Sequence, residues 1–186
     1  MNDGPSGVQV ADARRADAAA LAEIAARTFP LACPPSLTSA DIAAFIAANL
    51  SVERFRGYLA DPQRAVLVAH CGTDPAGYAM LIRHTGGPAV AGARAEAPVA
   101  ELSKMYVLPC WHSRGTAAAL MATALDRARA WHAEIIWLGV NRANVRAQRF
   151  YAKHGFTVSG TRTFAVGTAL EHDYVMSRRL DRPADR

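Results

Sequence analysis

Residues 101–121 read ELSKMYVLPCWHSRGTAAALM, and this stretch decides the fold. The run over 100–109 has the length and composition of a buried strand, and 115–131 has the apolar spacing of a long helix. The two meet at HSRGTA, residues 112–117. Because the start of a helix has unpaired N–H groups and carries the positive end of the helix dipole, this junction predicts a binding site for an anion.

The predicted anion site consists mainly of main-chain amides, to which Arg114 adds a positive charge, and such a site suits a pyrophosphate. HSRGTA has neither the glycines of G-x-G-x-x-G nor the lysine of G-x-x-x-x-G-K-[ST], which excludes two common nucleotide motifs. An ordinary tight turn would carry a similar sequence, so the junction alone leaves both interpretations open. The residues expected to bind the anion are Ser113, Arg114, Gly115, Thr116, Ala117 and Ala118.

The composition indicates one domain and argues against nucleic acid as a partner. With 186 residues and 51% hydrophobic residues, the chain is long enough for one sizeable core. We expect a single domain at 8–180, preceded by a flexible leader at 1–7 and followed by a tail at 181–186. The formal charge of +5 comes mostly from scattered Arg residues, without the interleaved aromatic residues on which bases stack.

Cysteine and histidine usage predicts a reducing compartment and no metal site. The three cysteines form no C-x-x-C pair, and the histidines show no H-E-x-x-H spacing. The first residues lack an export signal, and no run approaches the roughly 20 apolar residues of a membrane helix. We therefore expect a cytoplasmic protein with no membrane partner. The residues expected to serve packing are Cys110, Trp111, Trp131, Trp137 and Phe150.

Apolar runs and turn residues predict an α/β (α+β) fold, in which helices flank a mixed, mostly antiparallel central sheet of six to seven strands. The strand, helix, strand order over 100–140 is typical of a parallel crossover. The segment 85–100 has no usable period and is interpreted as a mobile surface connection. Strands are expected near 8–10, 65–70, 77–84, 100–109, 135–140, 156–164 and 171–180. Helices are expected near 18–29, 42–50, 55–59, 115–131 and 144–154.

A second motif, WLGVNRANVRAQRFYAKHGF at 137–156, follows the first in the same order and with strands between them. Together they resemble the GNAT superfamily of acyl-CoA-dependent N-acyltransferases. The family's loop pattern, Q/R-x-x-G-x-G/A, falls on His112, Gly115 and Ala117, with His112 as the one departure. The resemblance implies the GNAT fold and acetyl-CoA as co-substrate.

The resemblance also assigns roles to individual residues around the cofactor. The pantetheine arm of CoA would pair as an extra strand with the backbone of Met105, Tyr106 and Val107. Asn144 would hydrogen-bond the arm, and Tyr151 would donate a proton to the leaving thiolate. A half-buried aromatic residue would be the simpler interpretation of Tyr151.

Glu101 is the candidate for the base that deprotonates the attacking amine. It lies fourteen residues before Gly115, and this offset matches the catalytic glutamate of the histone-acetylating branch of the superfamily. A carboxylate at this position could also hold the ammonium group of the substrate or pair with an arginine. All three roles stay open at this point.

The acceptor is predicted as a primary amine on a small molecule, polyamine-like or other, or on a peptide. The closing segments look most like the bacterial spermidine/spermine acetyltransferase type, although Asn141 and Arg142 stand where such enzymes often carry Trp and Glu. Gly139 stands where ribosomal-protein N-terminal acetyltransferases usually carry Glu. The alternative function is a non-catalytic module that binds acetyl-CoA as a sensor. The sequence leaves open whether two chains form a homodimer.

Overall fold

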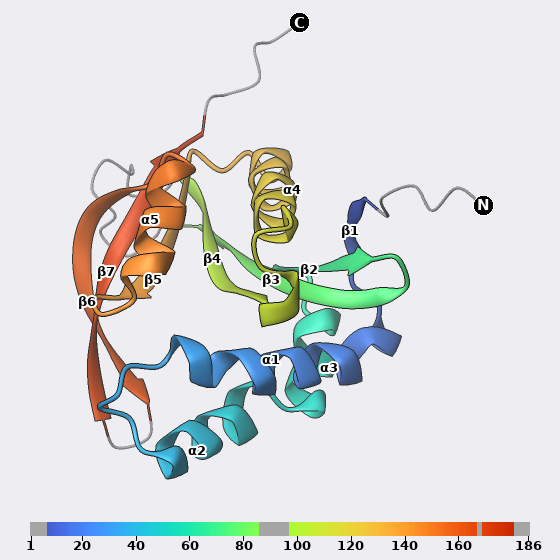
Figure 1. Cartoon of the computed structure of the whole chain (residues 1–186). Coiled ribbons are helices and arrows are strands. Elements are labelled where there is room, and N and C mark those ends of the chain that lie inside the picture. Colours follow the sequence, from blue (N-terminus) through green and yellow to red (C-terminus); the bar gives the residue numbers. More distant parts are fainter. Residues whose placement is uncertain (1–6, 86–96, 167–168, 181–186) are drawn as a thin grey trace, which may run out of the picture.

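Seven strands form one sheet in the order β1-β2-β3-β4-β5-β7-β6, and helices cover both of its faces (Figure 1). The computed structural model describes residues 7–85, 97–166 and 169–180. The strands are β1 Val8–Asp12, β2 Arg64–Cys71, β3 Asp74–Thr85, β4 Pro98–Val107, β5 Ile135–Asn141, β6 Thr157–Val166 and β7 Ala169–Arg179. The helices are α1 Ala18–Ala32, α2 Ser39–Asn49, α3 Val52–Ala60, α4 Thr116–Ala130 and α5 Val145–Lys153, with 3₁₀ turns at Arg15–Asp17 and Pro109–Trp111.

The predicted fold class is confirmed. Neighbouring strands run antiparallel except β4 and β5, which are parallel and are joined by the crossover helix α4. The predicted connection at 85–100 is shorter than expected, because β3 continues to Thr85 and β4 begins at Pro98. The described residues exclude 1–6 of the leader, 86–96 of the connection and the tail at 181–186. The limits of the domain therefore stay a prediction.

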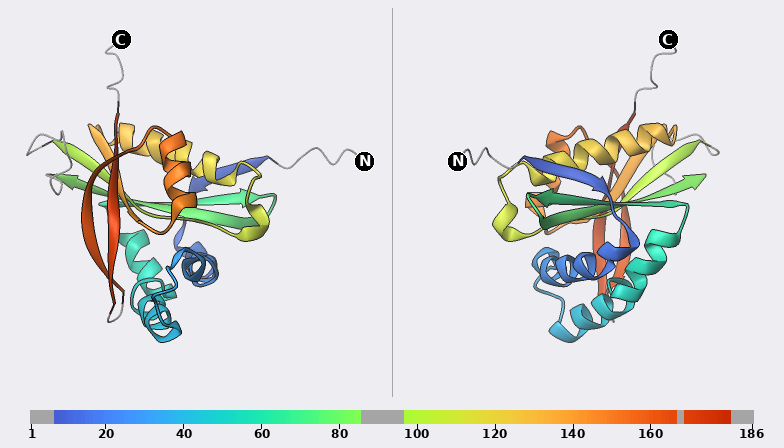
Figure 2. Two further views of the ribbon diagram at one scale, coloured as in Figure 1. Left: turned by 60° about the vertical axis from the view of Figure 1, so that its left-hand side comes forward. Right: turned by 90° about the vertical axis from the view of Figure 1, so that its right-hand side faces the viewer.

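The two larger hydrophobic cores lie on opposite faces of the sheet, beneath the helices that Figure 2 shows on either side of it. The first packs the apolar face of α4 against the sheet, through residues spaced three and four apart. The second packs α1 and α3 against the other face. The α4 residues of the first core are Leu120, Met121, Ala124, Leu125 and Ala128. No helix among the described residues has the length and apolarity needed to span a bilayer.

A β-bulge in β4 decides which side chains point to each core. The pairing with β3 shifts so that Met80 opposes Lys104 while Leu81 opposes Leu102, which leaves Ser103 as an extra residue. Because side chains alternate along a strand, this extra residue moves every later side chain of β4 to the other face. Leu102 therefore packs on the α4 side, whereas Tyr106 packs on the α1 side.

Some expected packing residues lie elsewhere. Cys110 is exposed, because it belongs to a short 3₁₀ turn outside the sheet, so its expected packing role is wrong. Trp137 is buried at 5% exposure, while Trp111 and Trp131 are half-buried at the edges of the cores.

We expect Gly77→Ala to lower the free energy of unfolding by about 1–3 kcal/mol, the usual effect of overpacking. A Cβ on Gly77 would lie 2.6 Å from the carbonyl oxygen of Tyr106, and the backbone of β4 would have to move. Gly57→Ala in α3 is the matched control: a Cβ there meets nothing within 4 Å, and alanine should raise stability by about 0.5–1 kcal/mol. Urea denaturation of both variants checks this, and equal effects would contradict it.

Candidate active site

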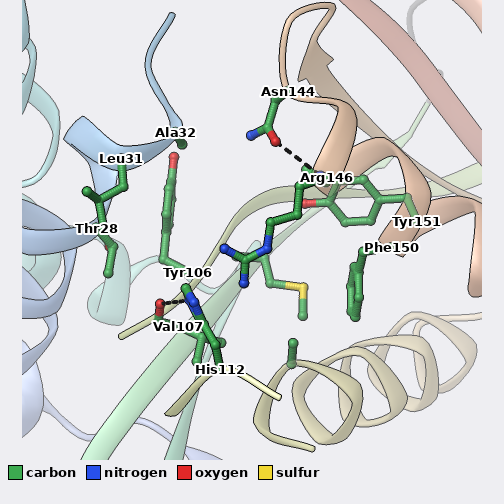
Figure 3. A pocket seen from close by; sticks show the side chains of 13 residues that line it. Thr28, Leu31, Ala32, Tyr106, Val107, His112, Asn144, Arg146, Phe150 and Tyr151 are labelled. Atoms are coloured by element: carbon green, nitrogen blue, oxygen red, sulfur yellow. Dashed lines mark hydrogen bonds between the residues drawn. The ribbon is translucent and has the colours of Figure 1, made fainter. Parts of the chain in front are cut away.

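Two cavities, each of about 210 Å³, meet between β4 and α5. The first cavity opens between the end of α1, β4, the loop before α4, and α5 (Figure 3). The second cavity lies between α1, α2, β4 and the β6–β7 hairpin. Both cavities have in common six lining residues, Ala32, Met105, Tyr106, Asn144, Ala147 and Tyr151.

The first cavity exists because β4 and β5 separate. Their parallel pairing covers Val99–Glu101 against Ile135–Trp137 and goes no further along these two strands. Beyond Glu101, the edge of β4 that faces β5 has no partner among the described strands and borders the cavity. Such an edge can pair with an extended ligand. The predicted residues Met105, Tyr106 and Val107 all line this cavity.

The loop before α4 has the backbone of an anion site. Ser113 has φ of 61° and Gly115 has φ of 83°, and Gly115 is the N-cap of α4. Thr116 begins the helix with its side chain buried and its hydroxyl 3.9 Å from Cys71 Sγ, so only its amide can meet a ligand. Ala117 lines the first cavity. The first amides of α4 are thereby brought to the cavity that β4 borders.

His112 replaces the usual Gln or Arg of the loop pattern and fastens the loop to β4. Its Nε2–H donates to the carbonyl oxygen of Val107 at 2.9 Å, since a carbonyl can only accept (Figure 3). Arg114 is exposed and its guanidinium lies 5.4 Å from the centre of the Trp111 ring. Sequence reasoning missed Arg146, whose exposed side chain extends from α5 into the first cavity (Figure 3).

Asn144 lies at the N-cap of α5 rather than inside the helix. Its Oδ1 accepts the amide hydrogen of Ala147 at 3.0 Å, a cap that typically contributes about 1 kcal/mol. Only its Nδ2 group is then suited to bind a ligand, and only as a donor. Phe150, expected in the core, is half-buried and lines the first cavity while it packs against the first core.

Tyr151 lies at the junction of the two cavities and is half-buried. Desolvation of its phenol raises the pKa of Tyr151 to about 12. Burial also raises the pKa of the neighbouring Tyr106 well above its ordinary value. Both phenols therefore stay protonated at neutral pH and act as hydrogen-bond donors.

The second cavity combines an apolar wall with charged groups that sequence reasoning missed. Phe29 and Phe45 stack with their ring centres 4.5 Å apart. Glu171 and Asp173 of β7 face them, and their spacing of two residues in a strand was the signal that could have placed both carboxylates on one face. The other charged residues that line this cavity are Lys104 and Arg162.

Burial also changes the pKa of Lys104, which lines the second cavity. Desolvation, with help from the nearby Arg64, lowers the pKa of Lys104 to about 8. Its Nζ lies 5.5 Å from the centre of the Tyr58 ring. A fraction of Lys104 is therefore neutral near pH 8.

Glu101 is the fourth residue of β4, and it lines neither cavity. Its Oε2 lies 3.2 Å from His84 Nε2, and its Oε1 lies 4.0 Å from Arg162 Nη1. Of the three roles that the sequence leaves open, the structure supports the pairing with an arginine. Within the described residues, no group of three His, Cys, Asp or Glu side chains could hold a metal ion.

Comparison with known proteins identifies the family of this chain. Residues 19–156 match the model of the acetyltransferase (GNAT) family. The chain belongs to this family. An uncharacterized N-acetyltransferase of Mycobacterium tuberculosis (strain ATCC 25618 / H37Rv) is 52% identical over 164 residues, which cover 88% of this chain and 98% of the relative.

Two solved structures have the same fold as this GNAT chain. The PaiA N-acetyltransferase of Thermoplasma acidophilum, in complex with coenzyme A, superposes with a TM-score of 0.74 at 18% identity, over 94% of this chain and 99% of that one. Naa50 of Arabidopsis thaliana, in complex with the bisubstrate analogue CoA-Ac-MVNAL, gives a TM-score of 0.63 at 18% identity, over 94% and 99%. The chain is thus an N-acetyltransferase by family, and the GNAT fold that the sequence predicted is confirmed.

Proposed function

We propose that this enzyme moves the acetyl group of acetyl-CoA directly to a primary amine, with the cofactor in the first cavity and the amine in the second. The observation that carries the proposal is the common wall of the two cavities, which includes Tyr106, Asn144 and Tyr151. An acyl group that enters from one side and an amine that enters from the other meet there. Direct transfer in a ternary complex then needs no nucleophile on the protein.

The cofactor would be bound mainly by main-chain groups. The edge of β4 at Met105–Val107 has no partner among the described strands on the β5 side, and it suits the amide-bearing pantetheine arm, although the Val107 carbonyl already accepts from His112. The amides of residues 113–118 suit the pyrophosphate. Arg114 and Arg146 add positive charge near the phosphates. The coenzyme A complex of the related fold from Thermoplasma acidophilum supports this choice of cofactor.

The role of Tyr151 follows from its pKa. With the reference pKa of a cysteine thiol, about 8.5, as a guide for the CoA thiol, complete transfer of a proton from a phenol of pKa about 12 would cost about 5 kcal/mol at 1.36 kcal/mol per pKa unit. Tyr151 is therefore better suited to stabilise the departing thiolate by a hydrogen bond than to surrender its proton in the rate-limiting step. A main-chain amide of β4 would polarise the acetyl carbonyl.

The acceptor is a cation before it reacts, and the carboxylates of the second cavity fit that charge. The apolar wall of Phe29 and Phe45 would pack against the carbon skeleton of the amine. The likeness of the closing segments to spermidine/spermine acetyltransferases favours polyamines, and the peptide analogue bound to the Arabidopsis protein favours peptide amines. The proposed acceptors are therefore polyamines and peptide amines.

The proposal is tested by measuring thiol release from acetyl-CoA with polyamines, aminoglycosides, amino acids and short peptides. We expect amine-dependent release of free thiol with at least one class, together with a matching acetylated product by mass spectrometry. Tight binding of CoA without thiol release for any amine would instead support a non-catalytic binding module.

We expect Tyr151→Phe to lower kcat about ten- to hundredfold, because a hydrogen bond to a charged group is worth about 1.5–3 kcal/mol. The affinity for CoA, measured by isothermal titration calorimetry, should stay within about twofold, since the ring is retained. An unchanged kcat would remove Tyr151 from the chemistry, and a large loss of CoA affinity would assign it to binding.

Gly115→Asp should weaken CoA binding at least about fivefold, because it places a negative charge beside the pyrophosphate. Two unit charges 4 Å apart repel by about 1 kcal/mol in water and by about 4 kcal/mol at an effective dielectric constant near 20. Gly115→Asn is the matched control, since asparagine has nearly the same shape, tolerates positive φ and carries no charge. Equal affinities of the two variants would argue against a phosphate site at this loop.

A further inference from the structure

We propose that Asp173 of β7 is the base that deprotonates the acceptor amine, and that Arg162, seated over Gly139, holds it in place. The inference rests on the proposed function, because it requires the amine to occupy the second cavity. Glu101, which the sequence suggested as the base, then acts as a positioning residue behind Arg162.

The place of Asp173 in the sheet is the first support. It pairs with Asn141, the last residue of β5, and so lies where β5 ends and the chain turns toward Asn144 and α5. Asp173 is 5% exposed and lines the second cavity, which Tyr151 also lines. Among the described carboxylates, only Asp173 and Glu171 line either cavity.

Glu171 has a structural task that Asp173 lacks. Its Oε1 accepts from the Ser36 hydroxyl at 2.9 Å, and its Oε2 accepts from Asn141 Nδ2 at 3.1 Å. Glu171 thereby ties the segment between α1 and α2 to the end of β5 across the cavity. Both of its oxygens are engaged by neutral donors, so we assign it to the cavity wall and to the local field rather than to proton transfer.

Arg162 is the partner of Asp173, and Gly139 makes room for it. Its Nε lies 3.4 Å from Asp173 Oδ2, and its guanidinium lies 5.6 Å from the centre of the Trp137 ring. A Cβ at Gly139 would overlap that guanidinium, so any other residue there would displace it. On its far side Arg162 faces Glu101, which in turn contacts His84. A line of contacts therefore runs from His84 through Glu101 and Arg162 to Asp173 in the cavity.

This environment suits a base. Burial raises the pKa of Asp173, Arg162 on β6 lowers it, and Glu171 on β7 raises it again, with a net direction upward. The remaining titratable groups that face this carboxylate or line the same cavity are Tyr106 of β4, Lys104 of β4, Tyr151 of α5 and Cys33 after α1. Asp173 thus binds a proton more tightly than an exposed aspartate does, while Arg162 limits the rise of its pKa.

The ammonium group of the acceptor gives one proton to the Asp173 carboxylate, and the freed nitrogen lone pair forms the N–C bond to the thioester carbonyl. The C–S bond breaks, and the thiolate leaves while Tyr151 donates a hydrogen bond to it. The second proton lost from nitrogen ends on the CoA sulfur, and Asp173 returns its proton to solvent. The products are an amide, free CoA and one proton.

The decisive experiment measures kcat against pH, at saturating acetyl-CoA and with the best amine of the panel. We expect Asp173→Asn to lower kcat about 10²- to 10⁴-fold with nearly unchanged CoA affinity. In the wild type, the acid limb of the profile should follow the pKa of Asp173. Arg162→Gln removes a cation, raises that pKa and should move the limb up by about one pH unit or more. Glu171→Gln removes an anion and should move it down.

Opposite shifts in these two variants assign the limb to Asp173, even if Asp173→Asn proves too unstable to assay. Glu53→Gln on the exposed face of α3 is the matched control and should leave both kcat and the limb unchanged. Full activity of a folded Asp173→Asn, or a limb that neither Arg162→Gln nor Glu171→Gln moves, would overturn the inference. A wild type without thiol release would instead overturn the proposed function, so the two failures are distinguishable.

Discussion

The separation of β4 from β5 is the constraint on which the rest of the site depends. Their pairing ends at Glu101 and Trp137, and from there the main-chain groups of β4 face an open cavity instead of a strand. The crossover through α4 makes this arrangement natural, because the helix must begin beside the end of β4. The unpaired strand edge and the helix amides are thus brought to one cavity by the same connection.

The bulge at Ser103 has an equal influence on the acceptor side. Without the extra residue, Tyr106 would point to the α4 core and Met105 to the α1 side. With it, Lys104 and Tyr106 face α1 and α3, while Met105 packs against the first core. One inserted residue therefore places Lys104 and Tyr106 on the side of the sheet that α1 and α3 cover.

The sequence predicted the strand order in the chain, the parallel crossover and the loop, because these depend on local apolar patterns and on a glycine at a helix start. Met105, Asn144 and Tyr151, which the resemblance rather than any periodicity assigned to the cofactor, line one cavity. The contact of Arg162 with Asp173 could not be predicted, because it joins neighbouring strands across a hairpin and needs the missing Cβ of Gly139. The exposed position of Cys110 was missed, since nothing in its local pattern indicates a 3₁₀ turn.

The charge arrangement around Asp173 is difficult to explain as a contribution to folding. Because its pKa is raised in the folded chain, the folded state binds this proton more tightly than the unfolded state does. Stability therefore falls as pH rises from the unfolded pKa through the folded one, and at neutral pH the raised pKa of this carboxylate costs stability. Replacing a buried ion pair by apolar residues is often neutral or stabilising. A buried aspartate that opposes folding at neutral pH, and that lines a cavity suited to a cationic amine, is better explained by the chemistry of that cavity.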